Sequence, residues 1–375
     1  MARMTGRERL RSIFEGRVPD RPAVKIWGAA PGQEVVHPAF LPIRDLAVAI
    51  TDLALGSDAL FNLYCGVHAA QLIEHRKVST ASPEWEDVVT TYHTPEGDLR
   101  EIFVQSTSGH PGYTREHLLK EPADLRKLLA MPYTPYAFDG ERYRVAEKKA
   151  GDAGLAYFRI PHPMAGVQSL IGSENFAIWS VDADALLQEA IGIFAQRARQ
   201  HAEAAIQAGI RSVFGWAGPE LCIPPLMPPD AFERYVFNID KPMIDRLHEA
   251  GGLVWVHCHG KMSSLMTRFQ AMGVDVLNPV EPPPMGDVTI AEAFVAVGDK
   301  MGLEGGIESH DLMTATPDTV RDLVRTTLKM GCGKRFVLCP CSGYMENPEP
   351  TEREIGNWRI LIEEGVRYAN TMTGA

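Results

Sequence analysis

Two histidines flank a cysteine in the run from residue 256 to residue 260, and residues of these types can bind a metal ion. We expect this run to close a β-strand, in which successive side chains point to opposite faces. His257 and His259 would then share one face, and Cys258 would take the other. Two imidazoles on one side of a strand end supply half of a tetrahedral zinc site. The alternative is a pair of hydrogen-bonded polar residues at a strand terminus.

Further candidate ligands follow two later strands. Glu281 follows His259 in the chain, and Cys339 and Cys341 form a Cys-x-Cys pattern further on. Two nitrogens, one or two thiolates and a carboxylate suit zinc better than magnesium or calcium, which prefer oxygen ligands. The residues therefore predict a zinc site in which both histidines, one or both cysteines and Glu281 are ligands. Glu281 could instead be a solvated loop charge or a helix cap, and the cysteines could be buried apolar side chains.

Two glycines and three carboxylates complete the set of candidate site residues. Gly305 and Gly306 end another expected strand, where paired glycines allow the backbone to approach a cofactor closely. Glu308 follows the glycines, and Glu220 follows the fourth expected strand. Together with Glu281, these two carboxylates are the candidates for catalytic proton transfer or substrate contact. A turn followed by a helix cap explains the glycines and Glu308 nearly as well.

The elements that must position these residues are short β-branched and aromatic runs, each followed by a helical pattern. Several runs are continuously apolar, as expected for parallel strands buried on both faces. The expected strands are Ala23–Trp27, Asp58–Leu63, Leu155–Ile160, Arg211–Trp216, Leu253–Cys258, Asp275–Asn278, Met301–Glu304 and Arg335–Cys339. About eight strands alternating with helices predict an α/β fold, the (β/α)8 TIM barrel, with its active site at the C-terminal strand ends. A doubly wound sheet is the alternative, but no expected strand is followed by a GxGxxG loop.

The segment from residue 72 to residue 105 breaks this alternation. Two alternating runs flank a turn-rich stretch at residues 94–98, which predicts an antiparallel β-hairpin inserted after the second strand. The expected helices are Asp182–Ala208, Asp230–Ala250, Ser263–Met272, Ala291–Gly298 and Pro317–Met330. We expect residues 1–375 to form a single TIM-barrel domain that carries this insertion. Tryptophans near the strand ends, Trp27, Trp216 and Trp255, are more typical of packing than of a substrate wall.

Composition excludes several classes of protein. The chain has 37 Lys and Arg against 48 Asp and Glu, and a net charge of −11 argues against nucleic-acid binding. The polar start has no apolar signal region, and no run reaches the ~18–20 apolar residues of a membrane helix. Six cysteines in a chain of 375 residues do not indicate a disulfide framework. We therefore expect a cytoplasmic protein without nucleic-acid or membrane partners.

An ordered set of motifs along nearly the whole chain resembles the uroporphyrinogen decarboxylase superfamily. The motifs are Arg7 to Leu10, Phe14 to Pro22, Thr94 to Leu99, Pro224 to Phe232, the His-x-x-Gly run from His257 to Gly260, Gly305 to Ile307, Asn357, and Arg367 with Tyr368. The decarboxylase itself carries arginines after the first strand and an aspartate after the second, which bind a porphyrinogen. Here residues 27–32 contain no arginine and residues 61–64 no carboxylate. A polyanionic substrate would be bound poorly without its cationic partners, so the pattern argues against porphyrinogen decarboxylation.

The chain is more similar to the zinc-dependent corrinoid methyltransferases of this superfamily. That branch has His-x-Cys at the fifth strand and another cysteine after the eighth, which bind zinc. This chain keeps His257 and has His259 in the place of the first cysteine, while Cys339 and Cys341 flank the expected position of the second. A site with more imidazole and less thiolate is a stronger Lewis acid, suited to a thiol, an alcohol or an ether oxygen.

The resemblance implies a zinc-dependent methyltransferase that moves a methyl group between a corrinoid protein and a small thiol or oxygen substrate. Methylcobalamin carried by the partner protein would supply the cobalt chemistry, as in O-demethylation or other C1 metabolism. Two further classes stay open: a metal-free decarboxylase or lyase acting on a non-porphyrin substrate, and a non-catalytic binding protein. The direction of transfer and the choice between the two cysteines are also open, and an exposed barrel face is compatible with a homodimer.

Overall fold

The computed structural model describes residues 3–341 and 345–372, and in these residues eight parallel strands form one curled sheet. The strands are β1 (Ala23–Val24), β2 (Leu53–Ser57), β7 (Gly154–Arg159), β8 (Val213–Ala217), β9 (Leu253–His257), β10 (Val276–Val280), β11 (Gly302–Ile307) and β12 (Phe336–Pro340). Their order in the sheet is β1-β12-β11-β10-β9-β8-β7-β2. The two end strands approach each other, because the Asp52 N–H donates to the Val24 carbonyl at 2.8 Å. This barrel-like α/β sheet confirms the predicted fold class.

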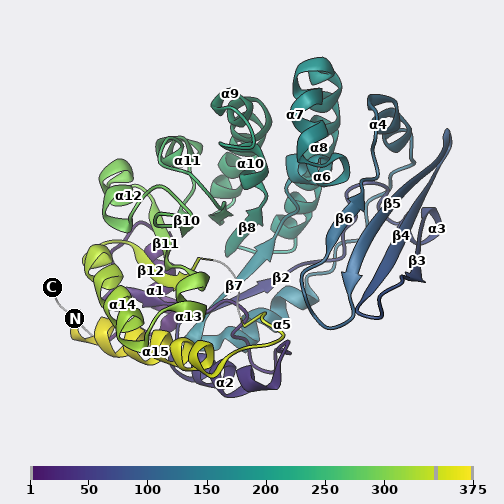
Figure 1. Ribbon diagram of the computed structural model, residues 1–375. Helices are drawn as coiled ribbons and strands as arrows, with labels where there is room; N and C mark the ends of the chain where they lie inside the picture. The colour runs from purple at the N-terminus through teal and green to yellow at the C-terminus, as the bar shows by residue number, and fades with distance from the viewer. Residues whose placement is uncertain (1–2, 342–344, 373–375) are drawn as a thin grey trace.

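The described residues also form helices, most of which surround the sheet on its outside (Figure 1). They are α1 (Gly6–Phe14), α2 (Leu41–Ile50), α3 (Ala69–Leu72), α4 (Pro122–Leu129), α5 (Glu141–Ala150), α6 (Pro163–Ile171), α7 (Ser173–Asp182), α8 (Asp184–Gln207), α9 (Pro229–Phe232), α10 (Asn238–Glu249), α11 (Met266–Met272), α12 (Ile290–Val297), α13 (Ser309–Thr314), α14 (Pro317–Gly331) and α15 (Glu352–Ala369). Threonine caps fix where two of them begin: the Thr289 and Thr316 side chains accept the Glu292 and Thr319 N–H groups. No helix in the described residues combines the length and apolarity needed to cross a membrane.

The second strand lies earlier in the chain than the sequence predicts. It spans Leu53–Ser57, whereas residues 58–63 were expected and instead form the loop that follows it. Asn62 explains the difference, because its side-chain oxygen accepts the N–H groups of residues 64, 65 and 66. An asparagine that bonds the following backbone in this way forms a turn rather than a strand. The other predicted barrel strands overlap the observed ones.

The predicted insertion after β2 is a four-stranded antiparallel sheet rather than a hairpin. Its strands are β3 (Ile73–Ser79), β4 (Trp85–Thr94), β5 (Gly97–Ser106) and β6 (Tyr113–Glu116). The β4–β5 hairpin pairs as the sequence predicts, with Val88 opposite Phe103 and Thr94 opposite Gly97. Gly97 closes the turn with a φ of +111°. The flanking strands were missed because β3 is mostly exposed and β6 is short. The inserted sheet stands to one side of the barrel (Figure 1).

Helix α1 closes the end of the barrel opposite the strand C-termini. Its side chains Leu10, Ile13 and Phe14 pack with the inward residues of the strands, among them Tyr157 and Trp255. Separate core residues fill the layer between the sheet and the outer helices. The barrel is therefore a packed structure with its open mouth at the strand C-termini, where the candidate site residues lie.

Candidate functional site

His257 and His259 lie side by side at the C-terminal end of β9, with ring centroids 4.5 Å apart. Each imidazole is held through Nδ1: His257 by the Asn278 side-chain oxygen at 2.7 Å, and His259 by Glu281 Oε1 at 2.8 Å. Burial lowers the pKa of His257 to about 4, so this ring is neutral near pH 7. Imidazole rings whose Nδ1 atoms are fixed in this way can offer Nε2 to a metal ion once that nitrogen is deprotonated.

Cys258 points away from both histidines. It is fully buried in the core between the sheet and the outer helices, and burial raises its thiol pKa well above the usual value. The strand alternation expected from the sequence is therefore present here. A thiol in this environment is an inert packing group.

Both carboxylate oxygens of Glu281 form hydrogen bonds with the two residues His259 and Gly260, which follow β9. Oε1 contacts His259, and Oε2 accepts the Gly260 N–H at 2.6 Å. Burial opposes a charge on His259, but the hydrogen bond and charge of Glu281 outweigh it and raise the pKa of His259. In this arrangement Glu281 orients the imidazole, a role that differs from the direct zinc ligand expected from the sequence.

Cys339 lies within β12, and Cys341 directly follows that strand. Cys339 Sγ accepts from the Asn278 amide at 3.4 Å, and burial raises its pKa to about 12. Cys341 Sγ lies 3.3 Å from the Gly306 nitrogen and 3.4 Å from the Val280 carbonyl, and its pKa is also raised by burial. The charges of Glu308 and Glu281 act on Cys341, whereas those of Lys25 and Glu304 act on Cys339. Cys341 is thus the thiol nearer the mouth.

Glu308 joins this cluster at the start of α13. It is buried, and its Oε1 has no hydrogen-bond partner. Burial and the nearby charge of Glu281 raise the pKa of Glu308 to about 7. A carboxyl group with such a pKa can give or take a proton near neutral pH.

The remaining predicted residues have internal partners. Glu220 Oε2 accepts the Gly218 N–H at 2.9 Å, and its charge reaches His259. A Cβ on Gly305 would lie 2.6 Å from the Val280 backbone, and one on Gly306 would lie 2.4 Å from Thr327. Close packing within the barrel therefore accounts for both glycines, while their role in cofactor binding stays a prediction.

Comparison with known proteins shows the family to which the chain belongs. The family model for uroporphyrinogen decarboxylase (URO-D) matches residues 161–352, about half of the sequence. The chain belongs to the uroporphyrinogen decarboxylase family. The resemblance seen in the sequence is thereby confirmed, and the matched segment contains the histidine pair, Cys339 and Cys341.

The curated relatives of this family member are methyltransferases. Two forms of methylcobamide:CoM methyltransferase MtaA, from Methanosarcina barkeri and its strain Fusaro, are each 25% identical over 224 residues. That match covers 59% of this chain and 61% of the relative, so the chain spans about three fifths of MtaA. A solved methyltransferase structure from Methanosarcina mazei matches over 97% of this chain and 99% of its own, with a TM-score of 0.61 and 15% identity. At this identity the structural match establishes the fold alone.

The donor set of this URO-D family member fits zinc by chemical type. Two imidazoles, one or two thiols and carboxylates are present, and the fixed Nδ1 atoms resemble the outer contacts that orient histidine ligands. In the described residues, no group of three or more His, Cys, Asp or Glu side chains is already arranged around a common metal position. Zinc binding would therefore require movement of the side chains that hold it.

Two elements of the site were missed by sequence reasoning. Asn278 links His257 to Cys339, and a buried pair of Lys25 and Glu304 lies in the barrel interior. A signal for the pair was present, since each charged residue falls in a run that was expected to be a buried strand. Charged residues are almost never fully buried unless they are paired.

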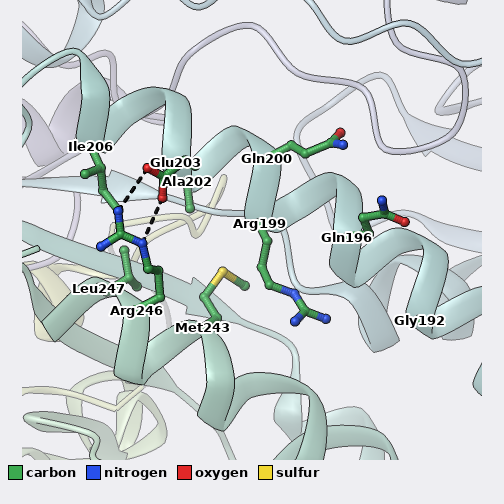
Figure 2. A pocket seen from close by; sticks show the side chains of 10 residues that line it. All are labelled: Gly192, Gln196, Arg199, Gln200, Ala202, Glu203, Ile206, Met243, Arg246 and Leu247. Atoms are coloured by element: carbon green, nitrogen blue, oxygen red, sulfur yellow. Dashed lines mark hydrogen bonds and ion pairs between the residues drawn. The ribbon is translucent and has the colours of Figure 1, made fainter. Parts of the chain in front are cut away.

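A surface groove lies elsewhere on the barrel. It has a volume of about 560 Å³ and runs between α8 and α10 on the outside (Figure 2). Arg246 forms two contacts with Glu203 across this groove, at 2.9 and 3.0 Å. None of the candidate site residues lines it.

Glu308 gives a prediction for pH dependence. Its folded pKa of about 7 lies above its ordinary value of 4.5, so folding favours the protonated form. The stability that this carboxyl contributes is complete below pH 4.5 and is lost as pH rises through 7. The unfolding free energy of the metal-free protein should therefore fall more steeply over this range than that of Glu308→Gln. The measurement is denaturant unfolding of both proteins across this pH range. Parallel profiles would show that folding does not raise the pKa of Glu308.

Proposed function

We propose that this chain is a methyltransferase that moves a methyl group between a corrinoid protein and a small thiol or oxygen substrate, using a bound zinc ion. The observation that carries the proposal is the histidine pair at the mouth. His257 and His259 are fixed at Nδ1, which leaves both Nε2 atoms to face a ligand. The names of the relatives support the corrinoid partner and the methyl transfer.

His257, His259 and Cys341 are the residues that would hold zinc, with Cys339 as the alternative thiol. When bound, zinc would stabilise the anionic form of a thiol or alcohol substrate as the attacking or leaving group. Glu281 keeps the His259 ring in place through its contact at 2.8 Å. Glu308 can accept the proton that the substrate loses, because its pKa of about 7 suits transfer near neutral pH.

Zinc binding tests the first part of this proposal. Metal-stripped protein titrated with zinc against a chelating indicator should bind about one ion per chain. A catalytic zinc site uses three protein ligands, and His257, His259 and Cys341 would supply the three ligands of one site. The bound zinc should survive gel filtration. Substoichiometric zinc after full exposure to the metal would contradict the zinc site.

Methylcobalamin tests the second part. Zinc-loaded protein should consume methylcobalamin in the presence of a small thiol acceptor, and metal-stripped protein should not. Zinc binding without consumption of methylcobalamin or formation of a methylated product would support a binding protein instead of an enzyme.

A metal-free decarboxylase or lyase is the second candidate function. The hydrogen-bonded His259 and Glu281, together with Glu308, provide a base and an acid without any metal. Turnover of a carboxylic-acid substrate by metal-stripped protein would favour this function over methyl transfer.

A further inference from the structure

A buried ion pair lies inside the barrel and contacts two tryptophans close to His257. Lys25 and Glu304 are both completely buried, and the Lys25 ammonium group donates to Glu304 Oε2. Lys25 follows β1, and Glu304 lies within β11. The second oxygen of Glu304 has no hydrogen-bond partner. None of the chemistry proposed above uses either residue.

The pair holds two indole rings. The Lys25 Nζ lies 3.9 Å from the centre of the Trp27 ring, which is a cation–π contact. Glu304 Oε2 accepts the Trp255 Nε1–H at 3.0 Å. The two indoles contact each other, with ring centroids 5.2 Å apart and planes at 56°. A single ion pair therefore fixes the orientation of both rings.

The indoles in turn reach the candidate site. The centre of the Trp255 ring lies 5.6 Å from the centre of the His257 ring, with the two planes tilted by 33°. Trp27 is half-buried and is the more exposed of the two indoles. The rings thus form an aromatic floor, defined as Trp27 and Trp255, next to His257.

Stability alone does not explain why charges occupy this position. Desolvation of a lysine and a glutamate is unfavourable, and proteins with well-packed apolar residues in place of a buried ion pair are often as stable or more so. What a charged pair adds is directional contact: a donor above one ring and an acceptor at the nitrogen of the other. Apolar side chains would fill the space without setting the angle between the rings.

We propose that Lys25 and Glu304 are positioning residues that fix the aromatic floor and, through Trp255, the His257 ring. The floor is the surface against which the apolar, methyl-bearing part of a substrate packs. This extension to the substrate rests on the proposed methyl transfer, whereas the positioning of the indoles does not.

The test removes both charges while keeping side-chain size. In Lys25→Met/Glu304→Gln no buried charge is left unpaired, so the protein should fold. Near-UV circular dichroism, which reports fixed packing of aromatic side chains, is measured on metal-free protein. The chain has six tryptophans, so Trp27→Phe and Trp255→Phe are used to assign the signal of the coupled indole pair. The double variant should lose this signal.

Asp240→Asn provides a matched control. Asp240 is also completely buried, accepts an indole N–H, from Trp216 at 3.0 Å, and has one oxygen without a partner. Trp216 packs in the outer core rather than at the mouth. This variant should keep the signal of the coupled pair and the rate of methyl transfer. Lys25→Arg/Glu304→Asp, which keeps the charges and the summed chain length, should restore the signal lost in the double variant.

Kinetics extend the test to the site. In Lys25→Met/Glu304→Gln, methyl transfer should slow by about ten- to hundred-fold, as for other residues that orient a ligand side chain. An unchanged coupled-pair signal in this variant, or an equal loss in Asp240→Asn, would overturn the positioning role. If the signal is lost but the wild-type protein transfers no methyl group, the proposed function fails while the positioning of the indoles stands.

Discussion

Replacement of His259 by alanine is expected to lower zinc affinity by more than about a hundred-fold and to remove most methyl transfer. Loss of an outer contact to a zinc ligand costs about ten- to hundred-fold, and loss of the ligand itself should cost more. His259 faces the mouth and is held by Glu281 at 2.8 Å, so the alanine variant also leaves that buried carboxylate without its partner. Zinc affinity by chelator competition and the rate of methylcobalamin consumption measure both effects.

Cys258→Ala is the control for this variant, because it changes the residue that precedes His259 on the opposite face of the strand. It should keep both zinc and activity, at a stability cost of roughly 1 kcal/mol for a small buried group. Cys341→Ser should lower zinc affinity more than Cys339→Ser, since Cys341 is the thiol nearer Glu308 and Glu281. Loss of the metal in Cys258→Ala with retention in His259→Ala would mean that the site is built around Cys258 instead.

Strand periodicity predicted the part of the site that depends on side-chain alternation. The opposite directions of Cys258 and His259, and the meeting of β9, β10, β11 and β12 at one rim, follow from the barrel and from the two-residue repeat. The partners of each side chain could not be predicted in the same way. Whether Glu281 binds a metal or His259 depends on distances of a few ångströms between separate loops. The spacing of residues along the sequence does not determine these distances.

The ion pair inside the barrel is the larger feature that the sequence did not predict. The position of Lys25 and Glu304 in apolar runs indicates that each needs a partner, but a separation of 279 residues does not show that they pair with each other. The displaced β2 has a different cause, since Asn62 bonds three successive backbone N–H groups and converts an apolar stretch into a turn. Short-range hydrogen bonds of this kind compete with strand formation, and an apolar pattern does not reveal which of the two prevails.

The family motif at the start of the chain has a structural role that leads to the second prediction. Arg9, on α1, contacts Asp20 at 2.8 Å and Asp52 at 2.5 Å, and all three side chains are buried. Asp52 Oδ2 also accepts the Val24 N–H at 2.9 Å, next to the backbone bond that brings β1 and β2 together. The guanidinium group therefore joins helix α1 to the point where the two ends of the sheet meet.

Arg9→Met is expected to lower the unfolding free energy by about 3–5 kcal/mol, because it leaves Asp20 buried without its direct partner and Asp52 with Arg21, at 3.3 Å, as its remaining cation. Arg11→Ala, on the same helix but exposed, should change it by less than about 0.5 kcal/mol. Burial alone would raise the pKa of Asp20, but hydrogen bonds from Arg9 and Met4 outweigh it and lower that pKa. The stability from this pair is thus present above the ordinary pKa of 3.8 and is lost as pH falls through the folded value, so wild type and variant should converge in acid. Denaturant unfolding at neutral and acidic pH measures both effects, and a small loss at neutral pH would mean that Arg21 or solvent compensates both carboxylates once Arg9 is removed.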